Sequence, residues 1–140
     1  MKALVKLALG PGSTEIREMP EPAPQPGEVI IEVGVAGICG SDIHIAKGEF
    51  LDWVRPPVII GHEFAGTIAA LGDGVEGLQV GQAVTSETTY RTCGRCHFCR
   101  TDSPNLCAER QVLGYQVNGV FTRYVAVPAG RVYPLPKGVD

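Results

Sequence analysis

Turn-forming residues divide this chain into short segments, and this feature limits its fold more than any other. The 140 residues include 18 glycines and 11 prolines, which favour tight turns and disfavour long helices. Within residues 28–35, Ile31, Val33 and Val35 fall on one face and Glu32 on the other, the alternation of a β-strand. Further β-favouring runs lie at residues 2–9, 64–71, 78–85, 119–127 and 131–135. The pattern predicts an all-β barrel or sandwich rather than a helical bundle or alternating strand and helix units.

The composition describes a folded chain with no basic surplus. The hydrophobic fraction of 44% and charged fraction of 19% exclude intrinsic disorder. Twelve basic residues oppose 15 acidic ones, for a formal net charge of -3, so no positive field attracts nucleic acid or anionic lipid. No apolar run approaches the roughly 18 residues of a membrane helix, and the first is interrupted by Lys6. We expect a cytoplasmic protein without a secretory signal, whose partners are small molecules.

Two segments differ from the strand pattern. Prolines alternate with other residues from Pro20 to Pro26, which predicts an extended connector because proline lacks the donor that a central strand needs. The best helix start is Ser41-Asp42, where a short polar side chain can cap a turn that runs to Ile45. The rest of the chain should contain few and short helices.

Four of the five cysteines lie within fifteen positions and point to a metal site. They are Cys93, Cys96, Cys99 and Cys107. Such close spacing is unsuited to an ordinary disulfide framework, while four thiolates on a short loop match a tetrahedral zinc site. A closed site of four thiolates leaves no position for substrate, so its predicted role is structural, to hold a loop that has no core of its own.

Two other interpretations of this cysteine cluster fit the sequence less well. An iron–sulfur run would continue with three residues to a fourth cysteine and a proline, but here seven residues intervene and Cys107 precedes Ala108. A nucleic-acid-binding zinc module would use Arg91, Arg95 and Arg100 beside the thiols, yet no aromatic series accompanies them. Zinc in a structural role is the favoured interpretation.

Cys39, His62 and Glu63 form a second set of possible ligands. A thiolate, an imidazole and a carboxylate can hold zinc with a coordination position left for water or substrate. On spacing alone the alternative is a buried free cysteine and a hydrogen-bonded core histidine, which are commoner than ligands. The sequence pattern by itself leaves both interpretations open.

Several segments, in order and spacing, resemble the medium-chain, zinc-dependent alcohol dehydrogenases, most closely in style the polyol and threonine dehydrogenase branches. The resemblance covers essentially the whole chain. The matching segments are residues 61–66 with Gly72 and Val75, residues 37–44, the cysteine cluster with its Asn105-Leu106-Cys107 ending, and residues 119–124. The resemblance implies a GroES-like, partly open β-barrel with a few short helices and a zinc-binding lobe.

The resemblance also implies roles for single residues. Cys39 and His62 match catalytic zinc ligands, Glu63 a ligand or exchangeable neighbour, and the four clustered cysteines the structural zinc. Ser41 and His44 match positions that relay the hydroxyl proton of the substrate to solvent, and Asp42 matches a residue that orients the zinc-bound histidine. The plain alternatives are a helix cap for Ser41 and Asp42 and a surface imidazole for His44. Trp53, Thr89 and Tyr90 lie where the family builds the walls of the substrate pocket, or are loop packing.

One glycine pattern is expected to be unrelated to cofactor binding. Residues 72–77 contain the glycine spacing of a dinucleotide site, but that fingerprint must open a helix, and the run at residues 78–85 is typical of a strand. We therefore expect residues 1–140 to be the GroES-like catalytic domain, with the family's Rossmann coenzyme domain absent from this chain. A further zinc ligand of the family would lie beyond Asp140, so the cysteine lobe should hold zinc more firmly than the Cys39 site.

The sequence-based hypothesis is the catalytic domain of a zinc-dependent dehydrogenase. It would oxidise an alcohol or polyol to the carbonyl compound with hydride transfer to NAD(P), and this chain alone would bind zinc without turnover. Full-length members of the family are usually homo-oligomers. The alternatives are a zinc-stabilised β-barrel that serves only binding or assembly, and an iron–sulfur electron carrier.

Overall fold

Antiparallel strands dominate the computed structural model, which describes residues 1–50 and 52–138. The largest sheet has the strand order β10-β6-β5-β3-β9. Its members in that order are β10 (Val132–Pro134), β6 (Ala83–Ser86), β5 (Glu63–Leu71), β3 (Glu28–Gly37) and β9 (Tyr124–Pro128). β10 and β9 are the two edges of this sheet, so the barrel is only partly closed. The expected mainly β, partly open barrel is therefore confirmed.

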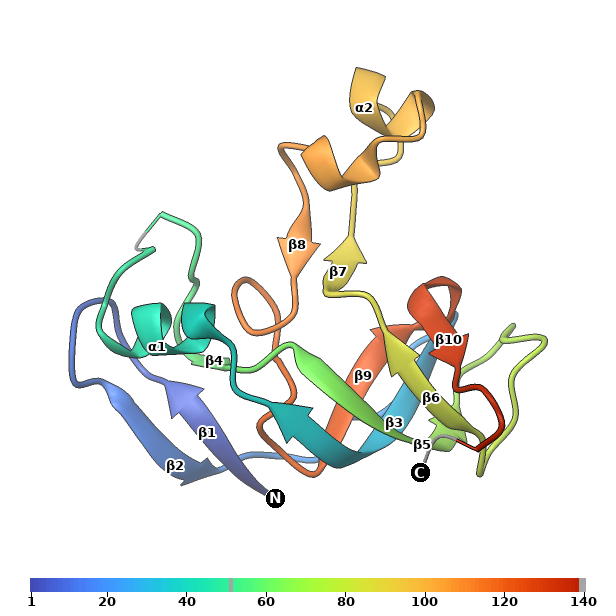
Figure 1. Cartoon of the computed structure of the whole chain (residues 1–140), viewed down its shortest axis with the longest axis horizontal. Coiled ribbons are helices and arrows are strands. Elements are labelled where there is room, and N and C mark those ends of the chain that lie inside the picture. The colour runs from blue at the N-terminus through green and yellow to red at the C-terminus, as the bar shows by residue number, and fades with distance from the viewer. Residues whose placement is uncertain (51, 139–140) are drawn as a thin grey trace.

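Two smaller sheets complete the β-structure. One has the order β2-β1-β4, from β2 (Thr14–Glu18), β1 (Lys2–Lys6) and β4 (Val58–Ile59), and a single bridge between Ala3 and Thr122 joins β1 to the segment that leads into β9. The other pairs β7 (Thr89–Arg91) with β8 (Gln111–Val112). In Figure 1 this short ribbon rises from the body of the molecule and carries α2 at its far end.

Helices are few and short, as expected. They are α1 (Gly40–Ala46), α2 (His97–Arg100) and the 3₁₀ turns η1 (Pro104–Leu106) and η2 (Ala129–Arg131). No helix in the described part of the chain has the length and apolar character needed to cross a membrane. The chain from residue 19 to 25 contains neither helix nor strand, which agrees with the predicted proline connector.

The core lies against the large sheet. Its centre is formed by aliphatic side chains of β3, β5, β6 and β9 and of the loops beside them, chiefly Val29, Ile31, Ile68, Val84, Leu113, Val120 and Val127. Each is at most 1% exposed. Val29 and Ile31 of β3 lie in this core, whereas Val35, predicted on the same face as Ile31, is 64% exposed because the register of β3 on β5 shifts between Val33 and Val35. Burying such side chains is the main favourable term that holds the sheets together.

Several predicted boundaries need correction. The run 78–85 forms a strand only from Ala83, because Gly77 and Gly81 have positive φ angles of 75° and 86° and turn the chain first. β2 was missed because four of its five side chains are exposed, which hides the alternation of a strand. The helix predicted to start at Ser41-Asp42 starts at Gly40 with Cys39 as the capping residue, so Ser41 is not its cap.

Candidate metal centres

Strand pairing brings Cys39, His62 and Glu63 together. β3 and β5 run antiparallel, and Gly37 at the end of β3 pairs with Glu63 at the start of β5. Cys39 follows Gly37 by two residues and His62 immediately precedes Glu63, so both segments meet at the same corner of the sheet. One ligand atom from each of the three residues lies within 4.8 Å of the other two. This is the arrangement that metal coordination by these residues requires.

The residues next to this site hold His62 from both sides of its ring. The Ser41 hydroxyl lies 3.2 Å from His62 Nε2, and Asp42 Oδ1 lies 3.5 Å from His62 Nδ1. Asp42 is 3% exposed, and its other oxygen accepts a hydrogen bond of 2.9 Å from the backbone N–H of Cys39. One buried carboxylate therefore contacts the segments that carry both Cys39 and His62.

The surroundings shift the pKa values of Cys39 and His62. Hydrogen bonding by the Ser41 hydroxyl, then by the Ser41 backbone N–H and by His62, lowers the pKa of the Cys39 thiol below its usual value. The Asp42 carboxylate raises the pKa of His62, while burial acts in the opposite direction. A thiol that ionises more readily is a better metal ligand, because the thiolate is the coordinating form.

The donor set fits zinc. His62 Nδ1 and Asp42 Oδ1 are buried and have no hydrogen-bond partner among the residues that the structure describes, and their separation of 3.5 Å is long for a well-formed hydrogen bond. A metal-binding histidine usually coordinates through one nitrogen and donates its other N–H to a carboxylate. His62 Nδ1 and Asp42 Oδ1 already lie next to each other. If His62 bound zinc through Nε2, a small movement of the side chains would let the Nδ1–H donate a hydrogen bond to Asp42 Oδ1. Sulfur, nitrogen and carboxylate oxygen are the ligands that zinc prefers.

His44 lies at the outer end of the same helix. It is three residues after Ser41 and so shares a face of α1 with it. Its side chain is exposed, its Nδ1 contacts a carboxylate oxygen of Glu49, and its ring packs edge-on against Phe50 at a centroid distance of 5.4 Å. Ser41 thus contacts the ring of His62, and His44 faces solvent.

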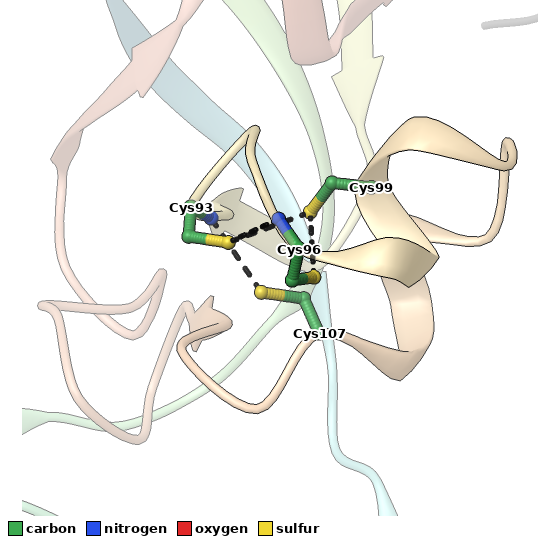
Figure 2. Close-up of side chains that lie close together, drawn as sticks. All are labelled: Cys93, Cys96, Cys99 and Cys107. Carbon is green, nitrogen blue, oxygen red and sulfur yellow. Dashed lines mark hydrogen bonds between the residues drawn. The ribbon is translucent and has the colours of Figure 1, made fainter.

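The second candidate centre is the lobe at the tip of β7 and β8. Its four cysteine sulfurs all lie within 4.8 Å of one another, and Figure 2 shows the side chains pointing toward a common centre. The sulfurs of Cys96 and Cys99 are 3.5 Å apart and those of Cys93 and Cys99 3.9 Å. These distances exclude disulfides, whose sulfurs lie about 2.05 Å apart. They match the edges of about 3.8 Å in a tetrahedron of sulfurs about 2.3 Å from zinc.

Backbone donors in the lobe stabilise thiolate charge. Hydrogen bonds from the backbone of Arg95 and then of Cys96 lower the pKa of Cys93 to about 6, and the bond from the Cys96 N–H to Cys93 Sγ is 3.3 Å. The Cys93 N–H also lies 3.5 Å from Cys107 Sγ. Such N–H to sulfur contacts favour the anionic form that a metal needs.

A cavity of about 340 Å³ adjoins the first centre. Three aromatic residues, one histidine and two polar residues form most of its wall: Phe50, Trp53, Tyr115, His62, Thr88 and Arg110. Because His62 belongs both to the cavity and to the candidate metal centre, a ligand in the cavity would lie beside the metal. The cavity has the size of a small-molecule site.

Of the three residues suggested as pocket wall or loop packing, one lines the cavity beside His62. Trp53 lines the cavity. Thr89 is buried in β7, and the exposed Thr88 before it lines the cavity instead. Tyr90 lines a different cavity and its hydroxyl donates a hydrogen bond to Glu28. Adjacent residues of a strand face opposite sides, so a shift by one position moves a side chain to another surface.

Other cavity residues were missed altogether. Phe50 follows α1, while Arg110 and Tyr115 lie before and after β8, and no local pattern marks them as neighbours of His62. The glycine pattern at residues 72–77 opens a turn after β5, and the helix that a dinucleotide fingerprint must open does not follow it.

Comparisons with known proteins agree with this geometry. Residues 25–137 match the alcohol dehydrogenase GroES-like domain. The chain is 48% identical over 140 residues to sorbitol dehydrogenase of Halalkalibacterium halodurans, covering 100% of this chain and 40% of that protein. It is 40% identical over 143 residues to L-threonine 3-dehydrogenase of Pyrococcus horikoshii, covering 99% of this chain and 40% of the relative. Thus the chain spans about 40% of the length of these curated relatives.

A solved structure shares the fold over nearly the whole chain. It is a putative zinc-binding dehydrogenase from Sinorhizobium meliloti 1021 bound to NADP, with a TM-score of 0.91 and 33% sequence identity. The alignment covers 99% of this chain and 39% of that chain. The described strands and the lobe therefore correspond to one part of a larger known architecture.

Proposed function

The chain belongs to the alcohol dehydrogenase GroES-like domain family, and from this premise we propose that it is the catalytic domain of a zinc-dependent dehydrogenase. The substrate would be an alcohol or polyol, oxidised to the carbonyl compound with hydride transfer to NAD(P). The convergence of Cys39, His62 and Glu63 within 4.8 Å beside a cavity is the observation that carries the proposal. Relatives named sorbitol dehydrogenase and L-threonine 3-dehydrogenase support it.

Each residue of the first centre has a proposed role. Cys39 and His62 would hold the zinc, with Glu63 as a third ligand or an exchangeable neighbour. Bound zinc would supply a Lewis acid that polarises the substrate oxygen and lowers the pKa of the alcohol. Asp42 would orient the ring of His62 from Nδ1, the atom it already faces at 3.5 Å.

Oxidation of an alcohol releases one proton and one hydride as the carbon–oxygen double bond forms. The Ser41 hydroxyl would receive the proton, and the exposed His44 on the same face of α1 would pass it to solvent; the distance of 3.2 Å between the Ser41 hydroxyl and His62 Nε2 supports this role. The hydride would go to NAD(P), whose binding we assign to a part of the polypeptide outside residues 1–140. The four-cysteine lobe would hold a second zinc in a structural role.

Metal analysis tests the first centre directly. We expect about two zinc ions per chain, one per centre, and Cys39→Ala should reduce this to about one. If the chain held about one zinc ion and Cys39→Ala did not change this number, only the lobe would bind zinc. That result would favour a binding or assembly module. Visible absorption typical of an iron–sulfur cluster would contradict zinc in the lobe.

Two measurements on the natural polypeptide test the wider proposal. Its intact mass should lie well above the 14.9 kDa of this chain, because a coenzyme domain must accompany the catalytic one. NAD(P) reduction in the presence of alcohols should depend on Cys39, and a Cys39→Ala variant should lose it. A polypeptide that oxidises no alcohol while holding two zinc ions would contradict the dehydrogenase assignment.

A further inference from the structure

The cavity beside His62 contains an arginine whose charge has no partner in the described part of the chain. Arg110 is half-buried and lines the cavity wall. Its guanidinium forms no ion pair with the residues that the structure describes, while Arg95, Arg123 and Arg131 all pair with glutamates at 3.0 to 3.3 Å. An unpaired guanidinium at the wall of a binding cavity favours an anionic ligand.

The neighbours of Arg110 leave its charge uncompensated. Glu109, the residue before it, is directed to Arg95, with an Nη2 to Oε1 distance of 3.3 Å. None of the residues that line the cavity is an aspartate or a glutamate. His62 is the other residue with a basic side chain among the described residues that line the cavity, and Ser41 and Asp42 lie next to its two ring nitrogens. The cavity therefore has a positive end at Arg110.

The lobe holds the backbone of Arg110 in place. Its N–H donates a 3.1 Å hydrogen bond to the carbonyl of Cys107, one of the four clustered cysteines. The next residue, Gln111, begins β8 and pairs with Arg91 of β7. Arg110 is thus fixed between the lobe and a strand, and a charged group on a fixed backbone orients a ligand better than one on a free loop.

We propose that the substrate is an alcohol that also carries an oxyanion group, a carboxylate or a phosphate, and that Arg110 binds this group. The inference deepens the proposed function and rests on it, because it places the alcohol end at Cys39 and His62. The aromatic residues Phe50, Trp53 and Tyr115 line the same cavity and supply apolar surface for the carbon skeleton. Guanidinium binds both kinds of oxyanion with two parallel hydrogen bonds. Arg110 is therefore a residue that determines specificity.

Three probes that share one polyol skeleton test the proposal. Glycerol, glycerate and glycerol 3-phosphate are titrated by calorimetry into the zinc-loaded 140-residue chain. Trp53, the chain's single tryptophan and part of the cavity wall, localises binding through its fluorescence. We expect at least one anionic probe to bind about tenfold or more tightly than glycerol, the effect of a hydrogen bond to a charged group. The two anionic probes decide between carboxylate and phosphate.

Matched variants attribute the preference to Arg110. Arg110→Gln should abolish it, while Arg110→Lys should keep part of it, because a lysine retains the charge and loses the paired geometry. Arg100→Gln removes an exposed charge of the lobe outside the cavity and should leave the preference unchanged. Equal affinities for all three probes, absence of binding, or a preference that survives in Arg110→Gln would overturn the proposal.

The test separates this inference from the proposed function. It measures binding and requires neither hydride transfer nor NAD(P). A chain that prefers anions through Arg110 but whose natural polypeptide oxidises no alcohol would contradict the dehydrogenase alone. A dehydrogenase that oxidises neutral and anionic alcohols equally well would contradict the role of Arg110 alone.

Discussion

His62 depends on the glycine that precedes it. Gly61 has a φ of 91°, and a Cβ at this position would lie 2.6 Å from the ring of Phe121. The Gly61 carbonyl is also approached closely by Gly119, where a Cβ would lie 2.0 Å from that oxygen. The chain can therefore turn into the start of β5, and present His62 beside Asp42, only with glycine at these positions.

A matched pair of glycine variants tests this account. Gly61→Ala should destabilise the protein by about 3 kcal/mol or more, since it adds the cost of a left-handed residue to a clash in the core. Gly74→Ala should cost only about 1 kcal/mol, because Gly74 has a φ of 75° but nothing within 4 Å of its Cβ position. Denaturant unfolding measures both. Equal losses would show that the contact with Phe121 has no effect on stability.

Among the residues that are not ligands, Asp42 should have the largest effect on the metal affinity of the first centre. Asp42→Asn keeps an oxygen for the Cys39 N–H but removes the carboxylate that faces His62 Nδ1. We expect a loss of zinc affinity of about 10 to 100-fold at this centre and none at the lobe. Competition with a metal-sensitive dye measures both sites. Unchanged affinity at the first centre would exclude an orienting role for Asp42.

At the scale of elements, the lobe has little apolar packing of its own. α2 is four residues long and buries none of its side chains, and Phe98 and Leu106 are 41% and 56% exposed. We expect the four cysteines to be the main feature that holds these turns in one arrangement. A metal bound by all four would supply the stability that a hydrophobic core supplies elsewhere.

Removal of metal from the lobe should disorder it without unfolding the barrel. In Cys96→Ser, amide protons of residues 93–107 should exchange with solvent much faster, while those of β3 and β5 stay protected. Hydrogen exchange by mass spectrometry resolves the two regions. Cys39→Ala is the control, because it alters the other centre and should leave exchange in the lobe unchanged. A lobe that stays protected in Cys96→Ser would show that other contacts hold it.

Tyr90 joins β7 to β3, and this contact should make stability depend on alkaline pH. Burial, followed by its hydrogen bond to Glu28, raises the pKa of Tyr90 to about 12 from the usual 10.0. Because the pKa of Tyr90 is higher in the folded than in the unfolded chain, the neutral hydroxyl stabilises the folded state. This contribution is complete below pH 10.0, the pKa in the unfolded chain, and is lost as pH rises through about 12.

Tyr90→Phe isolates this contribution. The substitution leaves the buried Glu28 without its hydroxyl partner and should cost about 1 kcal/mol at neutral pH. The difference in stability between the two proteins should shrink as pH rises from 10.0 to about 12. Denaturant unfolding across this range measures it, and the ultraviolet absorbance of tyrosinate checks the titration. A difference that stays constant with pH would contradict the assigned cause.

At the scale of the molecule, the two candidate metal centres are built in different ways. The lobe takes all four sulfurs from residues 93–107, while the first centre needs β3 and β5 to pair so that Gly37 meets Glu63. The lobe offers four cysteine sulfurs, and the first centre one cysteine sulfur, one imidazole and one exposed carboxylate. The two sites should therefore differ in affinity.

Stepwise chelation tests this difference. A chelator of increasing strength should remove zinc from the Cys39 centre first and from the lobe only later. Metal analysis counts the ions, and thermal unfolding should show a separate loss of stability with each step, since a bound metal stabilises the folded state that binds it. Release of zinc from the lobe first would contradict the expected order.

Much of the fold followed from local pattern. The strands at residues 28–35 and 64–71 appear almost as expected, since each is a run of several β-favouring side chains bounded by turn residues. β2, β4 and β8 could not be found this way, because strands of two residues or with mostly exposed side chains show no period. Such strands form only because a neighbouring strand offers its free hydrogen bonds.

The sequence by itself determined the cysteine lobe, because its four ligands lie close enough along the chain for a single loop to gather them. Only the tertiary structure decided that Cys39 meets His62, since the register of β3 on β5 sets that distance. Only the tertiary structure, too, placed Arg110 in the cavity beside His62, where loops from distant parts of the chain form one wall. Local physics acts over a few residues, and sites built from separated segments depend on how the whole sheet pairs.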